Sequence, residues 1–284
     1  MNSSHAEKAG IRSTWESAAP GWARWEPAVA QWMAPATDEM LAMAGVVAGA
    51  RVIDLACGAG SQTLAAAARV GPRGAVLAID IAEAMLAHVR ESARGAGLAN
   101  VETLAVAAED LDVPAGSFDA AISRLGLMLF ADPAGALQAL RRALRPGGKV
   151  AVVVFTSPAA NPMLARPMQV LLRHAGKAPP APGRPGLFSL GAPGALRALF
   201  ERGGFIDVEE HTRAVQLRMP SAGEALAMMQ EAFGAYRAVV ADCAEPVRAA
   251  AWAEVASVLE AFAHEGGFLA PSEVLVAAAR RPAE

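Results

Sequence analysis

Apolar runs alternate with segments of helical spacing between Arg51 and Phe155. The runs are short and almost continuous, which is typical of strands buried on both faces. They lie at 51–56, 75–79, 101–106, 118–123 and 149–155. The helical segments between them lie at 61–70, 82–96 and 133–144. This alternation predicts a parallel sheet covered by helices on both faces, with its ligand site at the carboxyl ends of the strands.

The pattern changes after Phe155. Residues 177–186 are rich in Pro and Gly and predict a loop. Beyond it we expect a helix at 193–202, strands at 205–210 and 213–218, helices at 222–240 and 245–263, and a strand at 273–279. The later helices are expected to cap the sheet. The predicted fold class is therefore α/β: a Rossmann-like, mostly parallel seven-stranded sheet with helices on both faces, plus a helical cap.

Composition excludes several classes of protein. The chain has 284 residues, of which 54% are apolar and 19% charged, an ordinary globular balance. The net charge is −3 and no stretch concentrates Lys and Arg, so we expect no nucleic-acid partner. No segment resembles a signal peptide or a membrane span. Cys57 and Cys243 form neither a disulfide framework nor a metal cluster. We therefore expect a cytoplasmic protein without a metal.

The main chemical signal is VIDLACGAGS at 52–61, a strand that enters a glycine turn and then a helix. Gly58 and Gly60 allow the backbone to bend sharply and approach a ligand. Asp80, twenty positions after Gly60, ends the next strand, where a carboxylate can accept hydrogen bonds from both ribose hydroxyls. A dinucleotide fingerprint would have glycine at position 63, but the residue is Thr63. Together with Asp54 ahead of the turn, this favours a nucleoside cofactor without a pyrophosphate.

Four segments of the chain together resemble a known family. VIDLACGAGSQT, VLAIDIAEAML, SFDAAISRLGLMLFADP and LRRALRPGGKVAVVVF resemble, in that order, the class I S-adenosylmethionine (SAM)-dependent methyltransferases. The likeness is closest to the bacterial group related to the ubiquinone/menaquinone methyltransferases. It is dense over 51–155 and thinner outside, where TWESAAPGWARWEP and NPMLARPM are similar to that group. The resemblance implies SAM as cofactor and one methyltransferase domain over 1–284. This would comprise a helical lid at 1–45, a SAM-binding core at 46–156, and the remaining sheet with cap helices at 157–284.

The resemblance also implies roles for residues beside the glycine turn. The backbone around Ala56, Gly58 and Gly60 would face the methionine part of SAM. Asp54 would orient this loop and the amino group of the cofactor. Arg124, after the fourth strand, would line the junction between cofactor and substrate, and a structural ion pair is the alternative role.

The remaining cofactor contacts implied by the resemblance follow the second and third strands. Asp80 would hold the ribose and Ile81 would lie against adenine. Three consecutive residues would flank the adenine edge: Ala108, Glu109 and Asp110. The family often has an acidic residue where this chain has Ala107. Whether Asp110 takes over that contact stays open.

Apolar and aromatic residues outside the core suggest a substrate pocket. Four tryptophans occupy positions 15, 22, 25 and 32, and their spacing could place them on one helical face. Pro20 and Pro27 are expected to interrupt a single helix. The tryptophans either form a lid over an apolar substrate or dock the amino-terminal segment. A second set lines a pocket or belongs to the core: Met128, Phe130, Met163, Met168, Met228, Met229 and Phe233.

The methyl transfer that the resemblance implies requires few catalytic groups from the protein. Because the methyl donor is already activated, the chain has to align the acceptor and exclude water. A base is required only where a proton must leave first. Candidates by chemistry alone are Tyr236, His174, His211 and His264, and no catalytic residue is identified. We predict methylation of a small, apolar or aromatic acceptor, with O- or C-methylation favoured over N. The alternatives are a SAM-binding protein without turnover and, disfavoured by Thr63, a nicotinamide-dependent dehydrogenase. A homodimer is left open.

Overall fold

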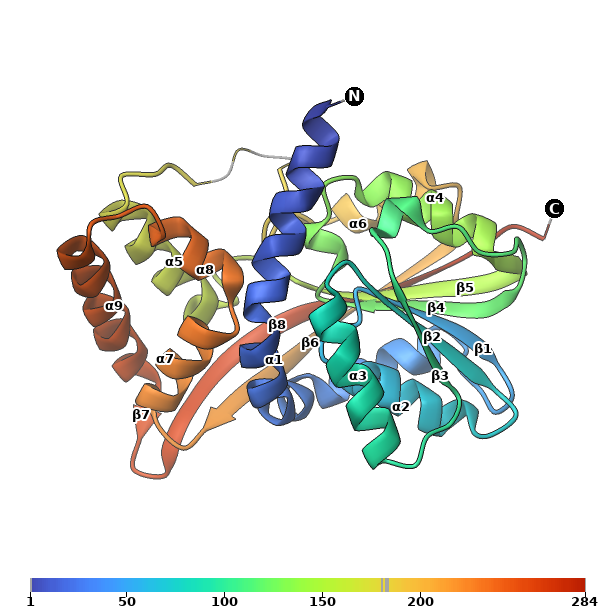
Figure 1. The fold of residues 1–284 in the computed structure, drawn as a ribbon, viewed down its shortest axis with the longest axis horizontal. Helices are drawn as coiled ribbons and strands as arrows, with labels where there is room; N and C mark the ends of the chain where they lie inside the picture. Colours follow the sequence, from blue (N-terminus) through green and yellow to red (C-terminus); the bar gives the residue numbers. More distant parts are fainter. Residues whose placement is uncertain (1, 180, 182–183, 284) are drawn as a thin grey trace.

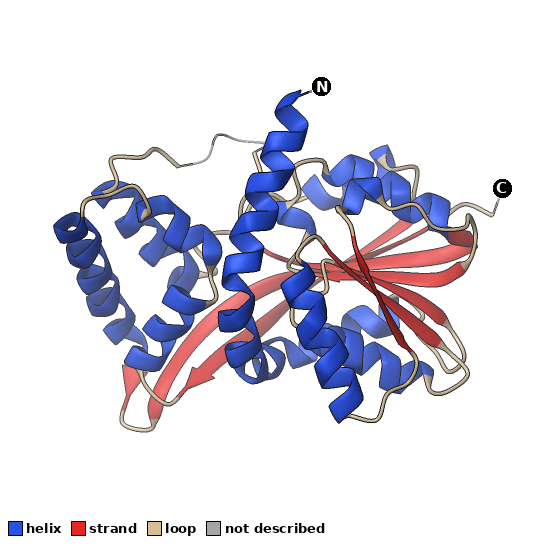
Figure 2. Cartoon of the chain, viewed as in Figure 1, coloured by secondary structure: helices blue, strands red, loops and turns tan. Residues whose placement is uncertain are grey.

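The computed structural model describes residues 2–179, 181 and 184–283, with side chains from Lys8 onward. Its central sheet has the strand order β3-β2-β1-β4-β5-β8-β6, and a short strand, β7, pairs with β8 (Figures 1 and 2). The strands are β1 Arg51–Leu55, β2 Ala75–Asp80, β3 Val101–Ala105, β4 Phe118–Arg124, β5 Leu144–Phe155, β6 Ile206–Met219, β7 Ala263–His264 and β8 Gly267–Arg280. The first five are parallel, and β8 runs antiparallel to both β5 and β6. The predicted seven-stranded, mostly parallel sheet is confirmed, with β7 as an addition.

Helices cover both faces of this sheet (Figure 2). Their bounds are α1 Asn2–Met43, α2 Ser61–Val70, α3 Glu83–Gly95, α4 Pro133–Ala143, α5 Pro162–His174, α6 Ala195–Arg202, α7 Ala222–Glu231, α8 Gly234–Val240 and α9 Glu245–Leu259. The elements between Arg51 and Ala143 agree with the predicted ones to within about two residues. Burial on both sides explains this, because β1 and β4 are buried at almost every position.

The amino-terminal helix differs from the prediction. Pro20, Pro27 and Pro35 all lie inside α1, which continues over 42 residues and bends in its second half (Figure 1). Each proline removes one backbone hydrogen bond. Packing compensates, since Ala18, Val29, Met33 and other residues of the helix are buried against the rest of the fold. Despite its length, α1 lacks the apolar character needed to cross a bilayer, and the same holds for every other described helix.

The carboxyl-terminal half contains further corrections. Helix α5 was not predicted, and α9 ends at Leu259 rather than 263. The strands expected at 205–210 and 213–218 are one strand, β6, with a register shift near Asp207, whose φ is +54°. β5 begins at 144 rather than 149, and β8 begins at 267 rather than 273. The helix expected over 222–240 is interrupted at 232–233, giving α7 and α8. The predicted loop at 177–186 has no helix or strand in its described part, and positions 180, 182 and 183 lie outside the described residues.

Helices α5, α7, α8 and α9 gather at one end of the molecule, where β8 and β6 continue past β5 (Figure 1). The pairing of β5 with β8 stops at Phe155 and Val274, while β8 pairs with β6 as far as Phe268. Asn161, fully buried just before α5, bonds the β8 backbone at this point. Its Nδ2 donates to the carbonyl of Glu273 at 3.0 Å, and its Oδ1 accepts the Glu273 N–H at 3.0 Å. The asparagine thus replaces a neighbouring strand and fixes α5 on the sheet.

Candidate functional site

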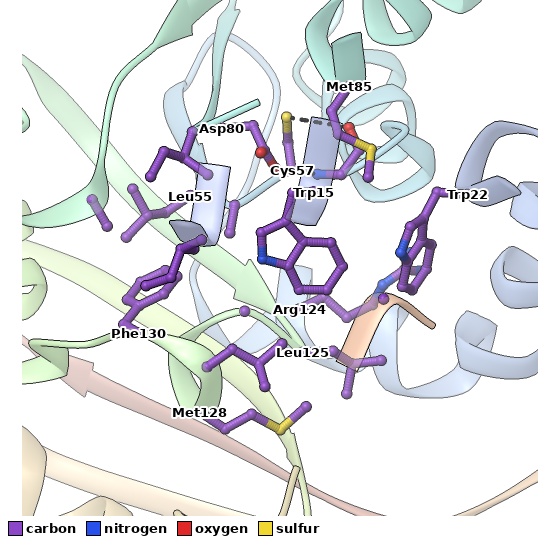
Figure 3. A pocket seen from close by; sticks show the side chains of 18 of the residues that line it. Trp15, Trp22, Leu55, Cys57, Asp80, Met85, Arg124, Leu125, Met128 and Phe130 are labelled. Carbon is purple, nitrogen blue, oxygen red and sulfur yellow. Dashed lines mark hydrogen bonds between the residues drawn. The ribbon is translucent and has the colours of Figure 1, made fainter. Parts of the chain in front are cut away.

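A cavity lies between the carboxyl ends of β1, β2 and β4 and one face of α1 (Figure 3). The α1 residues that line it are Lys8, Ile11, Trp15, Trp22, Glu26, Val29 and Trp32. Their spacing of three, four or seven residues corresponds to one helical face. The cap closes the cavity with Leu164 of α5, Leu187, and residues 233–236 at the start of α8. The ligand site is therefore where parallel-sheet topology predicts it.

The glycine turn after β1 forms part of the cavity wall. Ala56, Gly58 and Gly60 all have positive φ, at +56°, +56° and +102°. Ala56 and Gly58 line the cavity, and a side chain on Gly58 would meet nothing within 4 Å, so its backbone faces open space. Gly60 does not line the cavity. A Cβ there would lie 2.9 Å from Cγ2 of Val89, so this glycine allows α3 to pack against the turn.

Asp54 is fully buried behind this turn and is not part of the cavity wall. Its carboxylate accepts hydrogen bonds from Thr63 Oγ1 at 2.5 Å and Gln62 Nε2 at 3.3 Å, and Gln62 also donates to the carbonyl of Cys57 at 2.9 Å. Burial raises the pKa of Asp54 to about 7, against the two hydrogen bonds, which lower it. At the position where a dinucleotide fingerprint has glycine, this chain therefore has a threonine, Thr63, whose hydroxyl binds Asp54.

Asp80 ends β2 and lines the cavity (Figure 3). Its Oδ2 accepts the Gly58 N–H at 3.0 Å and its Oδ1 accepts the Ala82 N–H at 3.0 Å. Burial raises the pKa of this carboxyl, while the backbone hydrogen bonds oppose the shift. Because each carboxylate oxygen can accept more than one hydrogen bond, Asp80 retains capacity for two ligand hydroxyls.

The predicted adenine side is divided by the structure. Ile81, Ala108 and Glu109 line the cavity, together with Ala107, whereas Asp110 does not. Lys8 of α1, which the sequence analysis missed, also lines it. Its Nζ lies 3.2 Å from Oε1 of Glu109 and donates to Oδ2 of Asp110 at 2.6 Å. Asp110 thus holds the lysine at this edge, and no sequence signal distinguished Lys8 within its polar segment.

Arg124 combines a place in the cavity wall with a structural ion pair. It lines the cavity and is 8% exposed. Its guanidinium donates to Thr37 Oγ1 at 3.0 Å and Ser61 Oγ at 2.6 Å, and lies 3.9 Å from Oε1 of Glu26. Burial lowers the pKa of Arg124, whereas the carboxylates of Glu26 and Asp54 raise it. The residue connects α1, α2 and the end of β4 at one point of the wall.

Two glutamates of α1 cap the helices that border the cavity. Glu26 Oε1 accepts the N–H of Ser61, the first residue of α2, at 2.7 Å. Glu16 accepts the N–H groups of Glu83 and Ala84, at the start of α3, at 2.7 and 3.1 Å. A carboxylate at a helix amino terminus satisfies free N–H groups and complements the helix dipole. The sequence signal was indirect: the residues preceding these helices, Gly60 and Ala82, provide no side-chain cap.

The four tryptophans divide between the two predicted roles. Trp15, Trp22 and Trp32 line the cavity. Trp25 instead docks α1 on α7, because its Nε1 donates to Oε2 of Glu231 at 2.8 Å. Trp22 lies 6.0 Å from the ring of Phe233, and Trp32 lies 5.6 Å from that of Phe155, measured between ring centroids. We call the surface formed by Trp22, Trp32, Phe155 and Phe233 the aromatic wall.

Of the other apolar candidates, only some reach the cavity. Met128, Phe130 and Phe233 line it. The rest pack in the core or against it: Met163, Met168, Met228 and Met229.

The base candidates do not form a catalytic centre. His174 contacts Glu254, His211 contacts Glu39 and Glu209, and His264 lies in β7; none of the three lines the cavity. Tyr236 does line it, but its hydroxyl donates to the carbonyl of Leu164 at 2.8 Å and burial raises its pKa. No group of three His, Cys, Asp or Glu side chains suited to a metal occurs in the described part of the chain.

The cavity fits SAM. A turn with exposed backbone at Gly58, a carboxylate at the end of β2 and apolar residues such as Ile81 beyond it match a methionine, a ribose and an adenine in sequence. The fold and this site define a class I SAM-dependent methyltransferase. The profile of the ubiE/COQ5 methyltransferase family matches residues 31–175, about half of the chain. The chain belongs to this family, and its cofactor is SAM.

Individual relatives support the same family assignment. Over 200 residues the chain is 32% identical to nocamycin O-methyltransferase of Saccharothrix syringae, which covers 66% of this chain and 70% of that enzyme. It is 38% identical over 120 residues to the ubiquinone/menaquinone biosynthesis C-methyltransferase UbiE of Pasteurella multocida, covering 42% of this chain and 45% of the relative. The chain thus spans under half of that second relative. The YcgJ protein of Bacillus subtilis has the same fold, with a TM-score of 0.59, 16% identity, and coverage of 88% of this chain and 99% of that one.

Proposed function

We propose that this methyltransferase transfers a methyl group to oxygen or carbon of a small, apolar or aromatic acceptor. The observation that carries the proposal is one cavity that joins the Gly58–Asp80 cradle to the aromatic wall. The cradle suits the cofactor and the wall suits a flat apolar compound. The two relatives named as O- and C-methyltransferases support both atoms as targets, with nitrogen less favoured. Nothing in the comparisons favours a SAM-binding protein without turnover.

In this proposal each sequence-predicted residue has a defined task. Asp80 binds the ribose, and Ile81, Ala108 and Glu109 enclose the adenine. The backbone at Ala56 and Gly58 faces the methionine part, while Asp54 and Gly60 hold the turn in its conformation through contacts behind it. Arg124 stands at the junction with the acceptor.

When bound, SAM would supply an activated methyl group to a lone pair or carbanion of the acceptor, with its sulfur as the leaving group. The protein itself positions the acceptor and excludes water from the cavity. The aromatic wall orients a flat acceptor by its faces, and α1 closes the cavity from solvent. Alignment of this kind can contribute roughly 7–11 kcal/mol to barrier reduction. Residues 1–45 would serve as the lid, 46–156 as the cofactor-binding core, and 157–284 as remaining sheet and acceptor cap.

We further infer a cytoplasmic enzyme that acts on free small molecules rather than nucleic acids. The formal net charge of −3 supports this, because a phosphate-binding surface requires an excess of Lys and Arg. A homodimer stays open as its assembly, and sedimentation would decide it.

The test is a calorimetric titration of SAM and S-adenosylhomocysteine into the purified protein. We expect micromolar binding that is lost in Asp80→Ala, retained in the exposed-residue control Asp112→Ala, and not reproduced with NAD. Quinol, phenol and amine acceptors are then screened for release of S-adenosylhomocysteine. SAM binding without turnover of any acceptor would contradict the proposed acceptor class, and absence of SAM binding by the folded protein would contradict the assigned residues.

A further inference from the structure

Among the described residues, three carboxylates line the cavity, and two of them are engaged elsewhere. Asp80 accepts two backbone N–H groups at the end of β2, which is the proposed ribose position. Glu109 lies 3.2 Å from Nζ of Lys8 at the adenine edge. The third carboxylate is that of Glu26, which reaches the cavity from α1. Its cap on α2 uses only part of its capacity as a hydrogen-bond acceptor.

Glu26 has one carboxylate oxygen without a partner. Oε1 accepts the Ser61 N–H at 2.7 Å and lies 3.9 Å from the guanidinium of Arg124. Oε2 has no hydrogen-bond or ion-pair partner among the described residues, and it is not one of their buried unpaired atoms. The side chain is 18% exposed. Because Glu26 lines the cavity and Oε2 is accessible, this oxygen can accept a hydrogen bond from a ligand.

The position of Glu26 is beside the glycine turn. Ser61, whose N–H it accepts, is the first residue of α2 and follows the turn directly. Gly58 of the same turn lines the cavity and has open space where a side chain would lie. In the proposed function this part of the cavity faces the methionine part of the cofactor. Glu26 therefore lies at the end of the site where an α-ammonium group is expected.

Asp54, to which the sequence resemblance gave the amino group, is placed elsewhere. It is fully buried behind the turn, is not part of the cavity wall, and is bonded by Thr63 and Gln62. An ammonium group in a largely apolar cavity needs acceptors, because a charge removed from water without a partner is strongly unfavourable. Glu26 is the cavity-lining carboxylate beside the turn that can supply one.

We propose that Glu26 binds the α-ammonium group of the cofactor through Oε2. This deepens the proposed function and rests on it. The neighbouring guanidinium of Arg124 lines the same cavity and retains unused N–H donors after its bonds to Thr37 and Ser61 (Figure 3). It supplies the opposite charge, which suits the carboxylate of the same amino-acid group. A negative and a positive side chain 3.9 Å apart thus match the two charges of a zwitterion.

The contact also connects cofactor binding to the position of α1. Glu26 belongs to this helix, which contributes Trp22 and Trp32 to the aromatic wall. A cofactor with its amino group should therefore hold α1 against the cavity, and an analogue without that group should do so less. The cofactor would in this way stabilise the surface on which the acceptor binds.

The test compares two ligands of the wild-type protein by calorimetry. They are S-adenosylhomocysteine and its deaminated analogue, which keeps the nucleoside, the sulfur and the carboxylate and lacks only the amino group. We expect the analogue to bind at least about tenfold more weakly, because a charge-assisted hydrogen bond is lost. At saturation, S-adenosylhomocysteine should also slow hydrogen exchange in α1 more than the analogue does. Equal affinity of the two ligands, or equal protection of α1, would overturn the inference.

Matched variants assign the effect to Glu26. Glu26→Gln keeps the size of the side chain and removes its charge. Glu16→Gln, the control, removes the corresponding cap from α3 but is not part of the cavity wall. Weaker docking of α1 in either variant lowers the affinity for both ligands, so the ratio of the two affinities cancels that loss. The ratio of affinity for S-adenosylhomocysteine to affinity for the analogue should fall about tenfold in Glu26→Gln and stay unchanged in Glu16→Gln.

Two results with the variants would overturn the inference. One is an unchanged ratio in Glu26→Gln. The other is tighter binding of S-adenosylhomocysteine by Glu26→Gln, which would mean that Glu26 competes with the cofactor carboxylate at the start of α2. If the substitution prevents folding, the ligand comparison on the wild-type protein still decides. Failure of the folded wild-type protein to bind either ligand would instead contradict the proposed function.

Discussion

Ala56 and Gly126 approach each other so closely that a Cβ on Gly126 would lie 2.7 Å from the Cβ of Ala56. The two residues belong to the loops after β1 and β4, and both line the cavity. Ala56 has a φ of +56° and Leu125, next to Gly126, has a φ of +61°, in the region that L-residues seldom adopt. Unfavourable backbone at two adjacent loops is a common feature of functional sites.

This contact predicts that a substitution at Ala56 compensates for the loss caused by a substitution at Gly126. Gly126→Ala should destabilise the protein by about 1–3 kcal/mol and weaken SAM binding, because two Cβ atoms would overlap. Ala56→Gly should be nearly neutral alone, since relief of the left-handed conformation offsets the larger entropy of the unfolded glycine. The double variant should recover most of the loss. Thermal unfolding and SAM affinity measure the cycle, and additive effects of the two substitutions would show that the overlap is not the cause.

Asp54 should make stability depend on pH in an unusual direction. Its pKa is raised from 3.8 to about 7 by burial, so the folded protein holds a proton that the unfolded chain releases. Its contribution therefore decreases as pH rises from about 4 to about 7 and is constant above that. Asp54→Asn removes this pH-dependent contribution to the free energy of unfolding, which is on the order of 2–4 kcal/mol.

The measurement for Asp54 is denaturant unfolding of both proteins across that pH range. The difference between the two curves of unfolding free energy against pH isolates Asp54 from other carboxyl groups with shifted pKa values. The pKa of Asp80 is also raised. The pKa values of Glu39 and Glu254 are lowered by Arg213 and Arg173, respectively. A constant difference from pH 4 to 8 would mean that Asp54 is ionised throughout.

The carboxylate caps on α2 and α3 predict that the docking of α1 is electrostatic. Glu16→Gln and Glu26→Gln should each cost about 0.3–1 kcal/mol, rising toward roughly 2 kcal/mol for the partly buried Glu26. SAM affinity should fall several-fold and hydrogen exchange in α1 should accelerate. Glu91→Gln, at an exposed position of α3, is the matched control. High salt should weaken the docking of α1 in the wild-type protein in the same way. Unchanged hydrogen exchange in both glutamate variants would assign the docking of α1 to apolar packing alone.

The sequence predicted the parallel half of the sheet well because its signals are local. Each strand there is a short apolar run bounded by glycine, proline or a helix, and the site residues Ala56, Gly58 and Asp80 follow their strands directly. The long strands β6 and β8 were shortened because their burial alternates and a residue with positive φ, Asp207, interrupts β6.

The continuous helix α1 could not be derived from local signals. Proline predicts a helix break, but tertiary packing of α1 outweighs the lost hydrogen bonds. Lys8, Glu16 and Glu26 act on partners 35 to 102 positions away, and nothing in their neighbourhood marks them.

Tyr236 is the base candidate that lines the cavity, and its role can be checked directly. It is the only tyrosine in the chain, so tyrosinate absorbance reports on it alone. Because burial raises its pKa, the phenol should not titrate at pH 10 while the protein is folded, and stability should fall above that pH as the unfolded chain ionises. Tyr236→Phe removes one hydrogen bond to Leu164 and should cost about 1 kcal/mol. It should leave the pH profile of kcat/KM unchanged. A folded variant that loses turnover together with the alkaline limb of that profile would instead identify Tyr236 as a proton acceptor.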